Sequence, residues 1–137
     1  MKAAGFIIIM LLASCNMNSQ TPTKKQLFAE LKKQNVIDPV AAYQISMLET
    51  GHLSSRIAKE NNNLFGLKRG KEYMKFKNWK ECVKFFADLE CKKWEKYGIG
   101  GNYYDFVAWW GYKSGHHCGK SDVKYSEYLK KINCEFN

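Results

Sequence analysis

Residues 44–68 read QISMLETGHLSSRIAKENNNLFGLK, and this stretch decides how the rest of the sequence is interpreted. Its first part is apolar and ends in a single carboxylate, Glu49. Asp38-Pro39 is typical of a helix start, and Gly51 is typical of a helix end. We therefore expect a helix over 40–48 that places Glu49 at its C-terminal end.

A carboxylate at the end of a buried helix has a specific chemical use. Partial burial and the negative end of a helix dipole both raise the pKa of a carboxyl group. A carboxyl group that is protonated near neutral pH is what a glycosidase general acid must be. The alternative for Glu49 is an ordinary helix-terminal side chain that faces solvent.

The flanking sequence predicts a mainly α fold. Apolar periodicity and capping residues indicate helices on both sides of the central stretch, and Lys and Gly flank alternating apolar residues over 65–77, which predicts a short β-hairpin turning near Arg69-Gly70. The expected helices cover residues 24–35, 54–60, 79–94, 103–110 and 123–132. The expected inward-facing side chains are Leu27, Phe28, Leu31, Ala41, Ile45, Leu48, Val83, Phe86, Leu89, Leu129 and Ile132.

Length and charge bound the possible functions. The chain has 137 residues, which is enough for one domain, and 15% of them are aromatic, which argues against a disordered chain. Its 22 basic and 13 acidic residues give a formal net charge of +9. This charge predicts an anionic partner: nucleic acid, an anionic lipid surface or an acidic polymer such as a cell wall.

The first fifteen residues predict export. MKAAGFIIIMLLASC has one Lys, an apolar run and small residues before Cys15, and it is too short to span a membrane as a helix. Leu12-Ala13-Ser14-Cys15 resembles the bacterial lipobox, which implies a lipid on Cys15; an ordinary signal peptide is the alternative. We expect a signal over 1–15, a tether over 16–23 and a domain over 24–137. Asn16 and Met17 lack an acidic retention signal, which favours the outer membrane facing the periplasm.

Four further cysteines, Cys82, Cys91, Cys118 and Cys134, become candidates for disulfides in an exported chain. Cys82 and Cys91 fall on one predicted helix, about 13 Å apart along its axis, which is beyond disulfide reach. The expected pairings are therefore Cys82–Cys118 with Cys91–Cys134, or Cys82–Cys134 with Cys91–Cys118. Free thiols are the alternative.

Several segments together resemble the N-acetylglucosaminidase (glucosaminidase) family of peptidoglycan hydrolases. That family has a pattern like Ala-Gln-x-x-Leu-Glu-Ser/Thr-Gly followed by Asn-Asn-Leu-Phe-Gly-Ile/Met/Leu-Lys. This chain has YQISMLETG at 43–51 and NNLFGLK at 62–68. FKNWKECV at 76–83, and Gly-Tyr at 111–112 followed by SDVKY at 121–125, match two later family segments in the same order.

The resemblance implies a lysozyme-like helical fold with a cleft between the main lobe and the hairpin. It implies that Glu49 is the general acid and that Tyr125 is a cleft tyrosine, with a core aromatic as the equal alternative for Tyr125. Asn63 and Phe65 match the turn that shapes the cleft floor and are candidate substrate-binding residues. A purely structural role is the favoured reading of Phe65.

The short hairpin departs from the family pattern, which often includes a second acidic residue. Glu72 is the only acid in the lobe, and a surface charge is its favoured role over a catalytic one. The alternatives are the 2-acetamido group of the substrate as nucleophile, or water placed by other groups. Tyr73 is the best candidate for stacking on a sugar ring. The cations around it suit the carboxylates of the wall, or form a solvated face: Lys68, Arg69, Lys71, Lys75 and Lys77.

The sequence thus predicts a lipid-anchored, monomeric hydrolase of the β-1,4 bond between N-acetylglucosamine and N-acetylmuramic acid. The alternatives are an inactive peptidoglycan-binding lipoprotein and muramidase-type cleavage of the other glycan bond. We expect no cofactor, no nucleic-acid partner and no metal. His116, His117 and Cys118 invite a zinc interpretation, but the usual ligand spacings are missing, so a disulfide-bonded surface loop is favoured.

Overall fold

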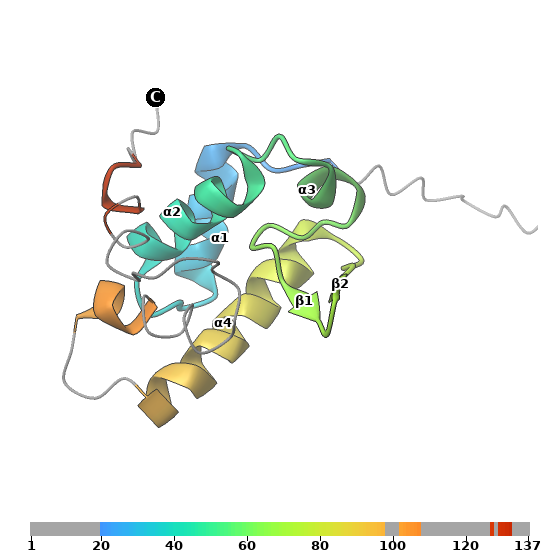
Figure 1. Ribbon diagram of the computed structural model, residues 1–137. Coiled ribbons are helices and arrows are strands. Elements are labelled where there is room, and N and C mark those ends of the chain that lie inside the picture. Colours follow the sequence, from blue (N-terminus) through green and yellow to red (C-terminus); the bar gives the residue numbers. More distant parts are fainter. Residues whose placement is uncertain (1–19, 98–101, 108–126, 128, 133–137) are drawn as a thin grey trace, which may run out of the picture.

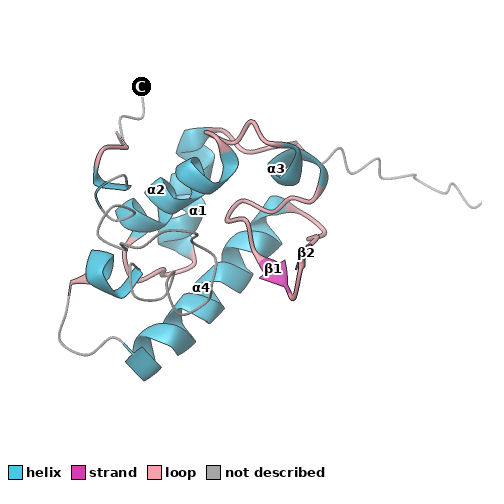
Figure 2. Cartoon of the chain, in the orientation of Figure 1, coloured by secondary structure: helices cyan, strands magenta, loops and turns pink. Residues whose placement is uncertain are grey.

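The computed structural model describes residues 20–97, 102–107, 127 and 129–132 (Figure 1). Within these residues the domain is mainly α, with a single two-stranded hairpin (Figure 2), as predicted. A further short helical segment covers residues 103–107. The elements in chain order are α1 (Lys24–Lys33), α2 (Pro39–Thr50), α3 (Arg56–Glu60), β1 (Lys68–Arg69), β2 (Glu72–Tyr73) and α4 (Trp79–Tyr97).

Side-chain caps begin the helices where the sequence predicts them. Asp38 accepts hydrogen bonds from the N–H groups of Val40 and Ala41 at the start of α2, and Ser55 accepts one from Ala58 in α3. Asn78 likewise accepts one from the N–H of Glu81 in α4. Each cap satisfies backbone donors that the first helical turn leaves without partners.

The domain begins slightly earlier than expected. Pro22, which was predicted to lie in the tether, is buried. Thr23 caps α1 in a capping box: its hydroxyl accepts from the N–H of Gln26, and the Gln26 side chain accepts from the N–H of Thr23.

In the part of the chain that the structure describes, no helix has the length and apolarity that a membrane span needs.

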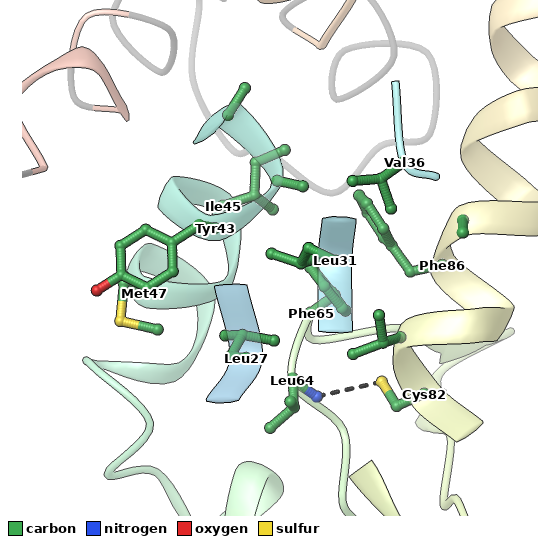
Figure 3. Packing of buried hydrophobic residues seen from close by; sticks show 14 of the residues in the cluster. Leu27, Leu31, Val36, Tyr43, Ile45, Met47, Leu64, Phe65, Cys82 and Phe86 are labelled. Atoms are coloured by element: carbon green, nitrogen blue, oxygen red, sulfur yellow. Dashed lines mark hydrogen bonds between the residues drawn. The ribbon is translucent and has the colours of Figure 1, made fainter. Parts of the chain in front are cut away.

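The core lies where α1 packs against both α2 and α4. Leu27 and Leu31 of α1 are fully buried, and every residue over 41–47 of α2 is buried (Figure 3). The predicted burial of Leu48 is wrong, because its side chain is 39% exposed. A single apolar stripe describes a helix that is covered on one side, whereas α2 is enclosed over most of its length.

A buried carboxyl group joins α4 to the segment between α1 and α2 and to the 103–107 segment. Glu90 of α4 is 0% exposed and accepts hydrogen bonds from the N–H of Ile37, at 2.8 Å, and from the hydroxyl of Tyr103. Burial is the main cause that raises the pKa of Glu90, and the nearby charge of Asp38 adds to it. Tyr103 also stacks on Trp94, so the 103–107 segment is fixed against the C-terminal half of α4.

The hairpin lies between the turn that follows α3 and the start of α4 in the sequence, and in Figure 1 it is drawn next to the first turns of α4. Its strands are antiparallel and pair Lys68 with Tyr73 and Arg69 with Glu72. Gly70 has a φ of +62°, and a glycine with positive φ at the first of two loop positions is typical of a type II′ turn. The predicted turn near Arg69-Gly70 is therefore confirmed.

Candidate active site

Glu49 lies in the last turn of α2 and is half-buried. The helix end beside it is tightly held: the Thr50 hydroxyl donates to the carbonyl of Ser46 at 2.6 Å and accepts from the N–H of Leu53 at 2.9 Å. Gly51 adopts the left-handed conformation expected of a helix cap, and its N–H donates to the carbonyl of Met47. These bonds fix the backbone from which the Glu49 side chain projects.

Gln44, one turn and a half earlier in α2, ties this helix to two distant segments. Its side-chain nitrogen donates to the carbonyl of Ile132 at 3.1 Å, and its oxygen accepts from the hydroxyl of Tyr104 at 2.7 Å. Gln44 is 5% exposed, so it acts inside the protein. Gln44 thus helps to hold the helix that carries Glu49.

Asn63 organises the turn that follows α3. Its side chain is fully buried; the Nδ2 atom donates to the carbonyls of Leu67 and Met74, and the Oδ1 atom accepts from the N–H of Leu67, all at 2.8–2.9 Å. Leu67 and Met74 lie directly before β1 and directly after β2, and they share a backbone hydrogen bond. One amide group therefore closes both the turn and the base of the hairpin.

Phe65 of the same turn is a core residue. It is 5% exposed, and its ring stacks on Phe86 of α4 with ring centroids 3.9 Å apart. The preceding residue, Leu64, is also buried and donates its N–H to the Cys82 sulfur, as Figure 3 shows. The burial of Phe65 agrees with the structural role favoured for it from the sequence. The Asn63 side chain is also buried and bonded to the turn, so in this structure it supports the turn and does not face a substrate.

Gly66 brings the two sequence motifs together. A Cβ atom built on Gly66 would lie 3.2 Å from Oε2 of Glu49 and 3.6 Å from its Cβ. Gly66 also has a φ of +62°, a conformation that glycine adopts readily. The Asn-Leu-Phe-Gly turn therefore packs its glycine against the carboxyl group of Glu49, and a Cβ atom there would require that group to shift by a few tenths of an ångström.

The hairpin presents Glu72 and Tyr73 to solvent on opposite faces. Successive side chains of a strand alternate between faces, so adjacent Glu72 and Tyr73 point in opposite directions. Glu72 is opposite Arg69 in the strand register, while Tyr73 is opposite Lys68, whose Nζ atom lies 4.5 Å from the centre of the Tyr73 ring. The two hairpin candidates therefore cannot both face the same ligand.

The cysteines that the structure describes do not support the predicted disulfides. Cys82 and Cys91 are both free; Cys82 is buried and Cys91 is exposed. Burial raises the pKa of the Cys82 thiol to about 12, so this thiol stays protonated. The other predicted site residues, Cys15, Cys118, Tyr125 and Cys134, lie outside the described residues.

Sequence reasoning missed the contacts of two motif residues, Gln44 and Gly66. Both residues belong to the stretches that define the resemblance, but only three-dimensional contacts show that Gln44 holds α2 and that Gly66 packs on Glu49.

Over the ranges that the structure describes, no group of three or more His, Cys, Asp or Glu side chains has the arrangement of a metal site.

Comparison with protein families gives one match. The family model named Glucosaminidase, described as mannosyl-glycoprotein endo-beta-N-acetylglucosaminidase, matches residues 25–137. Neither a curated protein nor a solved structure matches the chain.

Proposed function

The chain belongs to the glucosaminidase family, and on that premise we propose that it cleaves the β-1,4 bond between N-acetylglucosamine and N-acetylmuramic acid in peptidoglycan. Membership supports a hydrolase of peptidoglycan glycan bonds at the level of the family. The identity of the bond and the role of each residue are our proposal.

One contact carries the assignment of Glu49. Ten residues separate the two motifs of the family resemblance, 43–51 and 62–68, and the glycine of the second packs on the carboxyl group of the first. The left-handed backbone of Gly66 favours glycine at this position, and the lack of a side chain also leaves room for the Glu49 carboxyl group. The contact is what a site needs when the direction of one carboxyl group matters.

The proposed reaction uses Glu49 as the general acid. The carboxyl group gives its proton to the glycosidic oxygen as the bond from that oxygen to the anomeric carbon breaks. A water molecule then adds to the anomeric carbon and returns one proton to the carboxylate. The helix end and Gly66 contribute by fixing the carboxyl group before the substrate arrives.

The second group of the reaction is proposed to come from the substrate. A pair of carboxyl groups is the usual arrangement in glycosidases, and Glu72 is the one acidic residue between positions 61 and 80. Its place opposite Arg69 on the exposed hairpin suits a surface charge pair. The carbonyl oxygen of the 2-acetamido group is next to the anomeric carbon in the substrate itself and can form a bond to that carbon as the glycosidic bond breaks. The water molecule that adds to the anomeric carbon then breaks this bond, and the acetamido group is restored.

Charge favours peptidoglycan over the substrate in the description of the family. Mannose-rich glycans are neutral, whereas the wall polymer has carboxylates on its lactyl and peptide groups. A net charge of +9 raises the local concentration of an acidic polymer around the protein. We further propose that Cys15 is lipidated and that the domain works from the outer membrane, facing the periplasm.

Digestion of purified peptidoglycan by the wild-type protein and by Glu49→Gln tests the proposal. The products are reduced with borohydride and identified by mass spectrometry, and a mannosyl-glycoprotein is digested in parallel. We expect new reducing ends on N-acetylglucosamine with the wild type and none with Glu49→Gln.

Other products would change the assignment in defined ways. Reducing ends on N-acetylmuramic acid would keep the hydrolase and change the bond. Release of glycan from the mannosyl-glycoprotein alone would replace the substrate. If neither protein gives products while both sediment with the wall, the protein is a binding module.

A further inference from the structure

We propose that Lys68 and Tyr73 form a subsite for the muramoyl unit of the glycan, in which Tyr73 packs on the sugar ring and Lys68 pairs with a carboxylate of that unit. This proposal rests on the proposed function and adds the part of the substrate that the hairpin recognises. The carboxylate is on the peptide stem where a stem is present and on the lactyl group where it is not, because the stem is joined to the lactyl carboxyl group as an amide.

The first support is the geometry of the pair. Lys68 and Tyr73 are partners across the two strands, so their side chains share one face of the hairpin. The Lys68 ammonium lies 4.5 Å from the centre of the Tyr73 ring, and Tyr73 is 43% exposed. A cation held against an aromatic ring restrains the long lysine side chain before any ligand binds. The two neighbouring groups match the two parts of a muramoyl unit, an apolar sugar face and a negative charge.

The second support is the concentration of charge in the lobe. Residues 66–77 contain five cations and one acid, a net charge of +4 out of the +9 of the whole chain. All five cations are exposed. The one acid, Glu72, is opposite Arg69 on the other face, so it does not oppose Lys68 across the strands. The face with Lys68 and Tyr73 is therefore the one that offers an unopposed positive charge to a ligand.

The third support is the connection to Glu49. Gly66 packs on the Glu49 carboxyl group, and Lys68 follows two residues later, within about 7 Å of backbone. Asn63 binds the carbonyls of Leu67 and Met74 at the two ends of the hairpin, so the hairpin is fixed to the same turn. The pair thus lies within the length of a short oligosaccharide from the proposed acid.

A matched pair of variants tests the subsite. Lys68→Gln and Arg69→Gln each remove one exposed cation from β1, but on opposite faces of the hairpin. KM and kcat of the full chain are measured on soluble glycan fragments with peptide stems, on fragments stripped of stems, and on both after their carboxylates are converted to methyl amides. We expect Lys68→Gln to raise KM about threefold to fivefold on the untreated fragments, and Arg69→Gln to leave it within about 1.5-fold.

The amidated fragments complete a double-mutant cycle between Lys68 and the carboxylate. Lys68→Gln should behave as wild type on them. An effect restricted to stripped fragments assigns the lactyl carboxylate, and one restricted to stem-bearing fragments assigns the stem. Equal effects of Lys68→Gln and Arg69→Gln would overturn the subsite in favour of a diffuse field, as would an effect of Lys68→Gln that persists after amidation.

Binding separates this proposal from the proposed function. Affinities for the same fragments are measured by calorimetry with Glu49→Gln and with Glu49→Gln combined with Lys68→Gln. If the wild type cleaves no glycan but binding weakens threefold to fivefold on loss of Lys68, the reaction is wrong and the subsite stands. If the wild type cleaves glycan and Lys68→Gln changes neither KM nor affinity, the subsite is wrong and the reaction stands.

Discussion

At the scale of single residues, the absence of a side chain at Gly66 matters as much as the presence of one at Glu49. The carboxyl group occupies the space beside Gly66 at a distance that even a methyl group would disturb. Gly70 provides an internal comparison, because it has the same φ of +62° but no heavy atom within 4 Å of where a Cβ would lie. An alanine at either position strains the backbone, but only an alanine at position 66 also contacts Glu49, so comparing the two variants separates the two effects.

Gly66→Ala should reduce kcat about tenfold or more, because it displaces the proposed acid, while leaving KM largely unchanged. Gly70→Ala should keep wild-type kcat. Both variants should lose about 1–2 kcal/mol of unfolding free energy from the left-handed backbone, measured by urea denaturation. Equal kcat values for the two variants would show that the contact with Glu49 has no role in the reaction.

Glu72→Gln should leave kcat within about twofold of wild type, as is usual for exposed substitutions. The reason is its exposed position opposite Arg69. Glu60→Gln, on exposed α3, is the control for loss of one acidic charge. A loss of about a hundredfold or more in kcat for Glu72→Gln alone would instead assign the second catalytic carboxyl group to the hairpin.

At the scale of elements, the sequence correctly predicted the ends of α2 and the hairpin turn, which local interactions determine. It did not predict which side chains of α2 are exposed, which depends on the elements packed around that helix. The start of α2 at Asp38-Pro39, its stop at Gly51 and the turn of the hairpin follow from capping and turn chemistry within a few residues. The exposure of Leu48 depends on which other elements pack nearby, and no single segment specifies that. Glu49 could be singled out as a candidate from its motif, but its contact with Gly66 needed the fold.

The Asn63 side-chain amide makes three of the hydrogen bonds that attach the hairpin. Asn63→Ala should lower the free energy of unfolding by about 2–4 kcal/mol, because it leaves the partly buried N–H of Leu67 and carbonyl of Met74 without this partner. Asn63→Asp is the isosteric control; it should be at least as destabilising, since a carboxylate oxygen would replace the donor that faces two carbonyls. Chemical denaturation measures both, and a near-native stability of Asn63→Asp would argue that packing alone holds the turn.

At the scale of the whole molecule, the two halves of α4 contact different parts of the chain. Its first turns lie beside the hairpin and the Phe65 turn, near the proposed site. Its second half contains Glu90, which joins the connection between α1 and α2 to the 103–107 segment. The buried carboxyl group makes the cohesion of that end dependent on pH.

Burial raises the pKa of Glu90 above its ordinary value of 4.5, so the native state binds this proton more tightly than the unfolded state does. Its contribution to stability is therefore fully present below pH 4.5 and is lost as pH rises through the folded pKa. Glu90→Gln, which cannot ionise, should gain stability relative to wild type over that rise. Urea denaturation at pH values from 4 to 8 measures the free energy of unfolding of both proteins. A value for Glu90→Gln that falls relative to wild type as pH rises would contradict the assignment.

The buried Pro22 and the cap at Thr23 set a limit on where the domain can operate. Only seven peptide steps separate Cys15 from Pro22, a span of about 25 Å at full extension. With Cys15 lipidated as proposed, the proposed catalytic site would reach only a thin layer of the wall next to the membrane and could not reach glycan chains farther away. The distance of a glycan chain from the membrane would then decide whether it is cleaved, before affinity does. A longer segment between Cys15 and Pro22 should widen the zone of the wall that is cleaved.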